Sequence, residues 1–167
     1  MGFSIWAVEP QVKQPHFEND DADVWSKYFD KCYVTPGEYF SVNSWGWRPI
    51  PALLHRMGQI PDDELQSWGY NDGYIIEEKR ARKIGLFLTN IITSAATTRG
   101  IKKADYKEYC FNMDGRLMSW TEWEMNKVDW YEGMPRRDWD THYAIGLNML
   151  MDFAVFCVNC VGGFKIQ

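Results

Sequence analysis

Four side chains that can recognise a planar, charged ligand lie within six residues of one another: Asn43, Trp45, Trp47 and Arg48. An indole face stacks on planar rings, and a guanidinium group forms cation–π contacts or a two-pronged contact with phosphate. An asparagine amide both donates and accepts hydrogen bonds. Gly46, between the two indoles, would let a ligand approach the main chain closely. The segment therefore predicts a clamp for a small anionic aromatic ligand such as a nucleotide.

The same residues also suit a corner between a strand and a helix. In that interpretation Trp45 or Trp47 fills the core, and Arg48 stacks on an indole while it satisfies loop carbonyl groups. Aromatic residues dominate protein cores as well as binding sites, so the residue types do not decide between the two interpretations.

The run Asn43-Ser44-Trp45-Gly46-Trp47-Arg48-Pro49, with an apolar helix and Asn71-Asp72-Gly73 after it, resembles a pattern in small uncharacterised phage and bacterial proteins. These proteins share an Asn-x-Trp-x-Trp-Arg-Pro core. The resemblance covers about a fifth of the chain and implies a microbial or viral origin, without any activity. We include Asn71 and Asp72 among the candidate ligand-binding residues.

A second aromatic segment alternates with acidic residues, and its candidate interaction residues are Trp120, Trp123, Glu124 and Trp130. Aromatic and acidic side chains together suit a surface that binds a protein or a groove that binds a polar ligand. The alternative is a loop packed over the core with a solvated acidic edge.

Catalytic constellations are weaker. His142 lies four residues after Asp138, so a helix would bring them together as an oriented general base or as a simple ion pair. His16 and His55 have no carboxylate at such a spacing, and Asp62 and Asp63 are a further acidic pair. Glycine-rich phosphate-binding motifs are missing. We assign no catalytic residue.

The positions of the four cysteines favour the interpretation that their thiols are buried and inert. Cys157 and Cys160 form a C-x-x-C pair near the expected end of a helix, where the helix dipole does not lower a thiol pKa. Cys32 and Cys110 lack the spacing of further zinc ligands. We therefore expect no metal site and no cofactor.

Charge and composition exclude broad classes. The 167 residues carry 18 basic and 23 acidic side chains, a net charge of −5, so duplex nucleic acid is a disfavoured partner. The most apolar stretch, residues 144–161, contains Asp152 and predicts a buried helix rather than a membrane span. The beginning of the chain lacks a basic, apolar leader pattern, which favours the cytoplasm. Nine Trp, nine Tyr and nine Phe make a homo-oligomer plausible.

Two stretches carry the patterns of long helices. Apolar residues from Ile84 to Ala95 recur at helical spacing within an expected helix over residues 74–97, and a last helix is expected over residues 139–160. Pro49 and Gly58 bracket a shorter helix, and Pro61 and Gly69 bracket another.

Strands are expected at residues 3–8 and 38–43. A hairpin with a type I′ turn is expected at Asp114-Gly115, followed by a short helix with a capping box at residues 121–124.

These elements predict a single α+β domain over residues 1–167, with two long and several short helices packed on a small, mostly antiparallel sheet. For function, the first hypothesis is a non-enzymatic binding protein of phage origin that captures a small anionic aromatic ligand. The second is a protein-binding inhibitor or immunity-type module with one protein partner. The third is a small enzyme of unknown reaction.

Overall fold

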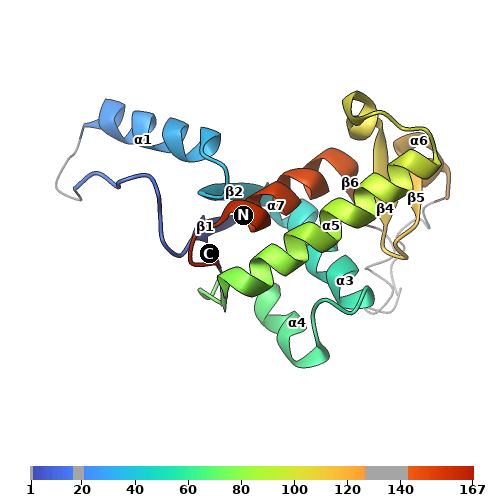
Figure 1. The fold of residues 1–167 in the computed structure, drawn as a ribbon, viewed down its shortest axis with the longest axis horizontal. Coiled ribbons are helices and arrows are strands. Elements are labelled where there is room, and N and C mark those ends of the chain that lie inside the picture. Colours follow the sequence, from blue (N-terminus) through green and yellow to red (C-terminus); the bar gives the residue numbers. More distant parts are fainter. Residues whose placement is uncertain (1, 17–20, 127–142) are drawn as a thin grey trace, which may run out of the picture.

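The computed structural model describes residues 2–16, 21–126 and 143–167. The chain folds as an α+β domain, as expected, with helices packed on small antiparallel sheets (Figure 1). The helices are α1 (Ala22–Val34), α2 (Ser44–Trp47), α3 (Pro49–Arg56), α4 (Asp62–Trp68), α5 (Glu78–Thr98), the 3₁₀ helix η1 (Lys103–Glu108), α6 (Trp120–Asn126) and α7 (Leu147–Asn159). The strands are β1 (Gly2–Ala7), β2 (Tyr39–Asn43), β3 (Ile75–Ile76), β4 (Tyr109–Asn112), β5 (Leu117–Ser119), β6 (Ala144–Gly146) and β7 (Phe164–Ile166).

The larger sheet has the strand order β2-β1-β7-β3, and every pairing in it is antiparallel. Alternate residues of β1 face the core, so Phe3, Ile5 and Ala7 are buried while Ser4 and Trp6 lie on the outer face. The second sheet has the order β5-β4-β6. One continuous apolar core joins the two sheets through the helices.

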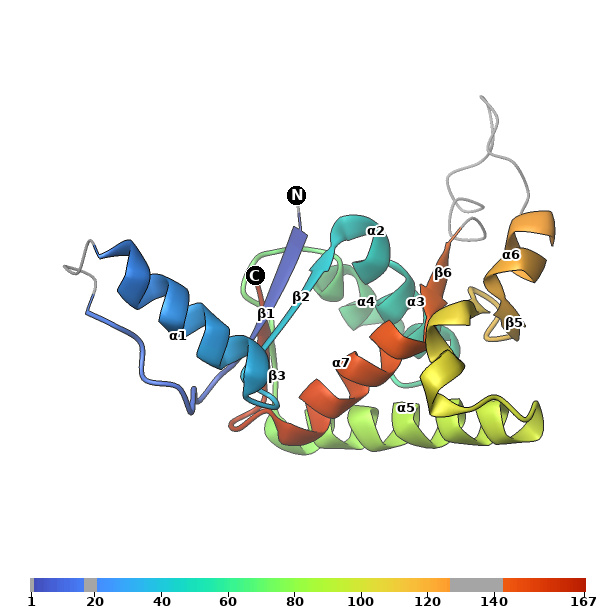
Figure 2. The ribbon, with the colours of Figure 1, turned by 90° about the horizontal axis from the view of Figure 1, so that it is seen from above.

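The two long helices pack side by side (Figures 1 and 2), and α7 also contacts β2 of the larger sheet. Their backbones approach closely at Gly85 of α5, where an added Cβ would lie 2.6 Å from the carbonyl oxygen of Ala154. Ile84, Leu88 and Ile92 form the buried stripe of α5, which confirms the helical periodicity. The two helices pack together because the apolar face of each must be covered.

The long helices are shorter than expected. α5 begins at Glu78 rather than residue 74, because Ile75 and Ile76 pair with β7. α7 begins at Leu147, because residues 144–146 pair with β4 as strand β6. The expected start of the last helix, residues 139–142, lies outside the described residues.

The hairpin between β4 and β5 is confirmed, but its turn type is not I′. Gly115 has φ +76°, whereas no other residue type among those described has a positive φ. The Gly115 N–H donates to the carbonyl oxygen of Asn112 over 2.9 Å, and the Asn112 N–H donates to that of Arg116 over 3.1 Å. This is the three-residue connection in which a type I turn precedes a glycine in the left-handed region.

The capping box lies two residues earlier than expected. The Ser119 hydroxyl accepts from the Glu122 N–H over 3.1 Å, and the Glu122 carboxylate accepts from the Ser119 N–H over 2.7 Å. This reciprocal pair starts α6 directly at the end of β5.

Helix α1 projects from one end of the molecule, and α6 lies at the other (Figure 2). Helix α1 is held against the rest of the molecule mainly by Tyr28 and Cys32, which are its buried residues. None of the helices within residues 2–16, 21–126 and 143–167 has the length and apolarity needed to span a bilayer.

Candidate functional site

Trp45 and Trp47 lie on opposite sides of α2. The Trp45 side chain is 64% exposed, whereas Trp47 is fully buried and donates its indole N–H to the carbonyl oxygen of Trp68 over 2.7 Å. Each helical residue turns the chain by about 100°, so two residues at spacing two point in nearly opposite directions. The expectation that both indoles face a ligand is therefore wrong for Trp47. The alternative interpretation, in which one indole fills the core, is confirmed for this residue.

Arg48 and Asn43 both lie beside Trp45, and both are exposed. The guanidinium carbon of Arg48 lies 5.6 Å from the centre of the Trp45 ring, a cation–π contact. The Asn43 side-chain oxygen accepts the Gly46 N–H over 2.7 Å and caps α2. Local capping and stacking thus account for the positions of both side chains.

A hollow of about 310 Å³ opens beside Trp45 and connects the two aromatic segments singled out in the sequence. We call it the Trp45 hollow. Its lining combines residues from the β2–α2 segment, the two indoles of α6, and residues of β6 and the start of α7. Its lining residues are Asn43, Trp45, Gly46, Trp120, Trp123, Tyr143, Ala144, Ile145, Gly146, Asn148 and Met149.

The aromatic walls of the Trp45 hollow are made of two ring pairs. Trp45 and Tyr143 lie 5.8 Å apart between centroids, with their planes 30° apart. Trp120 and Trp123 meet edge to face at 5.6 Å. Trp120 also lies against Gly146, where an added Cβ would be 3.5 Å from its ring. These rings offer stacking faces to a planar guest.

The N-terminal end of α7, a helix of 13 residues, contributes Gly146, Asn148 and Met149 to the lining of the Trp45 hollow. Its N-cap is Gly146, which supplies no side-chain cap, and the first turn has no acidic residue. The N–H groups and the dipole of a helix N-terminus favour an anionic group. The hollow therefore joins stacking rings to a weakly positive end.

The candidate interaction residues are partly placed. Trp120 and Trp123 are half-buried in the Trp45 hollow, and Glu124 is exposed on α6. Trp130 lies outside the described residues. Glu122 is the acidic residue with the clearer structural role, because the Ser119 backbone N–H, the Ser119 hydroxyl and Arg99, 3.6 Å away, together lower its pKa.

Asn71 and Asp72 do not line the Trp45 hollow. The Asn71 amide donates to the Gly2 carbonyl oxygen over 3.1 Å, and the Asp72 carboxylate accepts the Tyr74 N–H over 3.2 Å. Both side chains shape the loop before β3. Asn71 nevertheless reaches the end of the sheet where Gly2 is paired with Asn43.

The catalytic candidates give no described constellation. Asp138 and His142 lie outside the described residues. Asp62 and Asp63 begin α4 as exposed residues, where carboxylates stabilise a helix N-terminus. Contrary to the sequence analysis, His55 does have a carboxylate neighbour, because its Nε2 lies 3.3 Å from Asp62. Within residues 2–16, 21–126 and 143–167, no three His, Cys, Asp or Glu side chains gather as metal ligands.

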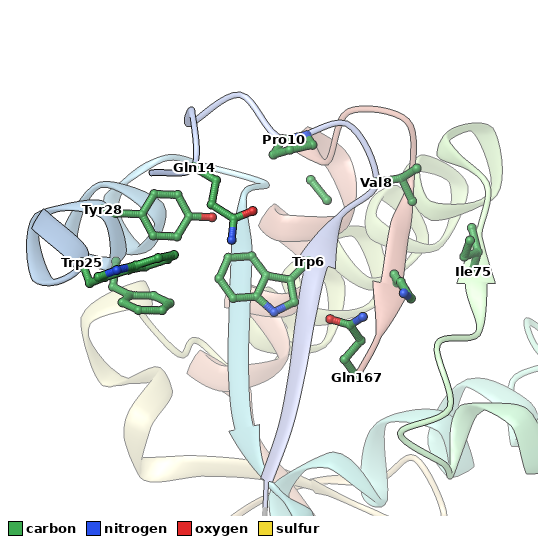
Figure 3. A pocket seen from close by; sticks show the side chains of 11 residues that line it. Trp6, Val8, Pro10, Gln14, Trp25, Tyr28, Ile75 and Gln167 are labelled. Carbon is green, nitrogen blue, oxygen red and sulfur yellow. The ribbon is translucent and has the colours of Figure 1, made fainter. Parts of the chain in front are cut away.

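Sequence reasoning missed a second hollow, of about 430 Å³, between α1 and the outer face of the larger sheet (Figure 3). We call it the α1 crevice. Trp6, Trp25 and Phe29 give it aromatic walls, and Gln14 and Gln167 add amide groups. The one available signal was the alternation of β1, which puts Trp6 on the face opposite to that of Phe3 and Ile5.

The four thiols are buried and free, in agreement with the sequence analysis. Burial raises the pKa of Cys110 and Cys160 to about 12, and it also raises the pKa of Cys157 well above its ordinary value. Such thiols are protonated at neutral pH and make poor nucleophiles or metal ligands.

No protein-family model, no curated protein sequence and no solved structure matches the chain.

Proposed function

We propose that the protein is a non-enzymatic binding protein that captures a small anionic aromatic ligand, such as a nucleotide, in the Trp45 hollow. One observation carries the proposal. Two aromatic segments far apart in the chain, represented by Trp45 and Trp120, converge over the uncapped N-terminal end of α7.

The dimensions and chemistry of the Trp45 hollow support this class of ligand. Its volume of about 310 Å³ lies at the lower end of the range for small-molecule pockets, roughly 300–1,000 Å³. A base can stack on Trp45, while a phosphate can accept from the α7 amide groups. Arg48, stacked on Trp45, adds a positive charge next to the hollow.

Isothermal calorimetry against a panel of mononucleotides and dinucleotides tests the proposal. We expect at least one nucleotide to bind. The corresponding nucleoside should bind more weakly, because it has no phosphate to which the N–H groups of the helix end can donate. Trp45→Ala should weaken binding roughly 5- to 100-fold, the usual effect of losing one base-stacking ring. Tyr70→Ala removes another exposed aromatic side chain, 53% exposed and outside the Trp45 hollow, and this variant should bind normally.

Two outcomes would reject the proposal. One is the absence of heat for every nucleotide in the panel. The other is an unchanged affinity in Trp45→Ala, since the stacking ring would then contribute nothing.

A protein-binding module is the second candidate, and the surface of α6 favours it. Met125 is 80% exposed on α6, three residues after Glu122 and next to Glu124 in the chain, and both of these acidic residues are exposed as well. Exposed apolar residues ringed by acidic ones suit a basic protein partner. A stoichiometric partner that is lost with Glu124→Lys, while nucleotide titrations remain silent, would select this function over ligand capture.

A further inference from the structure

Strand β2 is an edge strand without the usual protection. It pairs with β1 on one side, and no strand pairs with its other side among the described residues. Its five residues, from Tyr39 to Asn43, contain neither a charge nor a proline. Natural edge strands generally carry one of these features, because an uncharged open edge is a template for another strand.

The register shows which main-chain groups of β2 are open. Ser4 exchanges hydrogen bonds of 2.6 and 2.8 Å with Gln167, so its main chain faces β7. The Ala7 N–H donates in the opposite direction, to the carbonyl oxygen of Glu38, over 3.0 Å. In an antiparallel ladder these directions alternate, so Phe40 bonds to Ile5 across the ladder.

By the same alternation, the N–H and C=O groups of Tyr39 and Ser41 point away from β1. No hydrogen bond from another described residue reaches these groups. The outer edge of β2 thus presents two N–H donors and two C=O acceptors, at the spacing with which an added antiparallel strand would pair.

A groove of about 400 Å³ runs along this open edge, between the C-terminal end of α1 and the side of α7. We call it the edge groove. Its lining residues are Tyr33, Val34, Thr35, Pro36, Gly37, Tyr39, Phe40, Ser41, Asp152, Val155 and Phe156.

Both walls of the edge groove expose apolar side chains. Val34 is 78% exposed on the α1 side, and Val155 is 44% exposed on the α7 side. Asp152 is the single charged residue of the lining, and it lies on the α7 wall. A strand seated on β2 would direct alternate side chains toward these two walls.

We propose that the edge groove binds an extended peptide of a partner protein, which adds a strand to β2. The peptide places a Lys or Arg side chain against Asp152 and an apolar side chain on Val155. The main-chain groups of Tyr39 and Ser41 supply the hydrogen bonds, as in other cases of strand addition. The net charge of −5 favours a basic peptide over a second copy of this acidic chain.

The test uses a displayed library of random ten-residue peptides selected on the intact protein. We expect the selected peptides to alternate apolar residues with others and to contain Lys or Arg. Their affinities are then measured by fluorescence polarisation on wild type, Ser41→Pro and Ser41→Ala. Proline removes the outward N–H without touching the ladder to β1, whereas alanine keeps that N–H. Ser41→Pro should bind roughly tenfold more weakly, and Ser41→Ala should bind as wild type does.

A second measurement leaves the protein unchanged, and therefore holds even if Ser41→Pro folds poorly. Selected peptides are N-methylated at one backbone position at a time. Methylation at alternate positions should abolish binding, because only every second peptide N–H faces β2. Asp152→Asn should lower the affinity of the Lys- or Arg-containing peptides and flatten its salt dependence.

Three results would overturn the proposal. They are a library that yields no binders, binders that tolerate methylation at every position, and binders indifferent to Ser41→Pro. A wild-type dimer in light scattering that becomes monomeric in Ser41→Pro would instead assign the edge to a second copy of the chain.

Discussion

The indole of Trp47 stacks on that of Trp68, with centroids 6.2 Å apart and planes 8° apart, and donates its N–H to the Trp68 carbonyl oxygen. This pair joins α2 to α4 at the centre of the core. Trp45, two residues before Trp47, lies on the surface. One short segment thus supplies both a core anchor and the edge of a candidate site.

Truncating Trp47 should therefore affect stability, and truncating Trp45 should affect binding. We expect Trp47→Ala to lose about 3–5 kcal/mol of unfolding free energy, because it creates a large cavity. Trp45→Ala should change the unfolding free energy by less than about 1 kcal/mol, since its ring is mostly solvated. Urea denaturation measures both.

Trp47→Phe is the matched control for the hydrogen bond. It keeps most of the ring volume but leaves the Trp68 carbonyl oxygen without its donor, and should fall between wild type and Trp47→Ala. Equal losses for Trp45→Ala and Trp47→Ala would contradict the assignment of the two rings.

Glu38 secures the loop that follows β1. Its fully buried carboxylate accepts the N–H groups of Gln11 over 2.8 Å and of Val12 over 3.3 Å. Glu38→Ala leaves both donors without this acceptor and should cost about 1–3 kcal/mol. Hydrogen exchange should show faster exchange of the Gln11 and Val12 amides.

Glu38→Gln separates the acceptor from the charge. Its amide oxygen can still accept one of the two N–H groups, so the loss should be smaller than for Glu38→Ala. Unchanged exchange at both amides in Glu38→Ala would show that other contacts hold the loop.

Gly85 should not tolerate alanine, although alanine is the better helix former by about 1 kcal/mol. The added methyl would lie 2.6 Å from the Ala154 carbonyl oxygen and 2.9 Å from the Val158 nitrogen. We expect Gly85→Ala to destabilise by about 1–3 kcal/mol as α5 and α7 are pushed apart. Ser94→Ala, at an exposed position of the same helix, should be neutral or slightly stabilising in thermal unfolding.

Glu64 should make stability depend on acid pH. Burial alone would raise the pKa of this carboxyl, but hydrogen bonds from Tyr74 (2.8 Å) and Arg80 outweigh it and lower the pKa below its ordinary 4.5. Because the folded pKa is the lower one, the contribution is complete above pH 4.5 and is lost as the pH falls through the folded pKa.

Tyr74→Phe tests this dependence by removing one hydroxyl. The pKa of Glu64 should rise toward its ordinary value, and the unfolding free energy should fall less steeply with acid than in wild type. Urea denaturation between about pH 3 and 7 gives the two slopes. Identical slopes would mean that the hydroxyl does not hold the carboxylate charge.

The thiols should resist modification until the protein unfolds. Burial raises the pKa of Cys110 and Cys160 to about 12, so a thiol reagent at about pH 8 should find almost no thiolate. All four cysteines should react in denaturant. Ser26→Cys adds an exposed thiol on α1 and should react at once in the folded protein. Rapid labelling of the wild type would contradict the burial of these side chains.

Elements with a strong local signal were predictable from the sequence. The apolar stripe of α5 repeats over several turns, and Pro49 and Gly58 bracket α3 by their own backbone preferences. Each of these signals is complete within about twenty residues. The α+β class follows from combining them.

Elements that depend on distant partners were not predictable. Strand β7 is three residues long, and it exists because Lys165 and its neighbours pair with Trp6 on one side and Ile75 on the other. The same pairing delays the start of α5. Short strands carry too little periodicity to be recognised alone.

The candidate site was predictable in part. The sequence singled out both aromatic segments of the Trp45 hollow, because the segments around Trp45 and Trp120 are unusually rich in aromatic residues. It could not show that the segments meet, because that depends on tertiary packing. It also treated Trp45 and Trp47 as a pair, which the turn of α2 separates.

The central position of β7 has a consequence for biosynthesis. During synthesis β1 is made before its partner β7, and residues 8–163 lie between the two strands. Because β7 lies between β1 and β3, the larger sheet cannot be completed until residues 164–166 have been made, and pairing over such a long sequence separation slows folding.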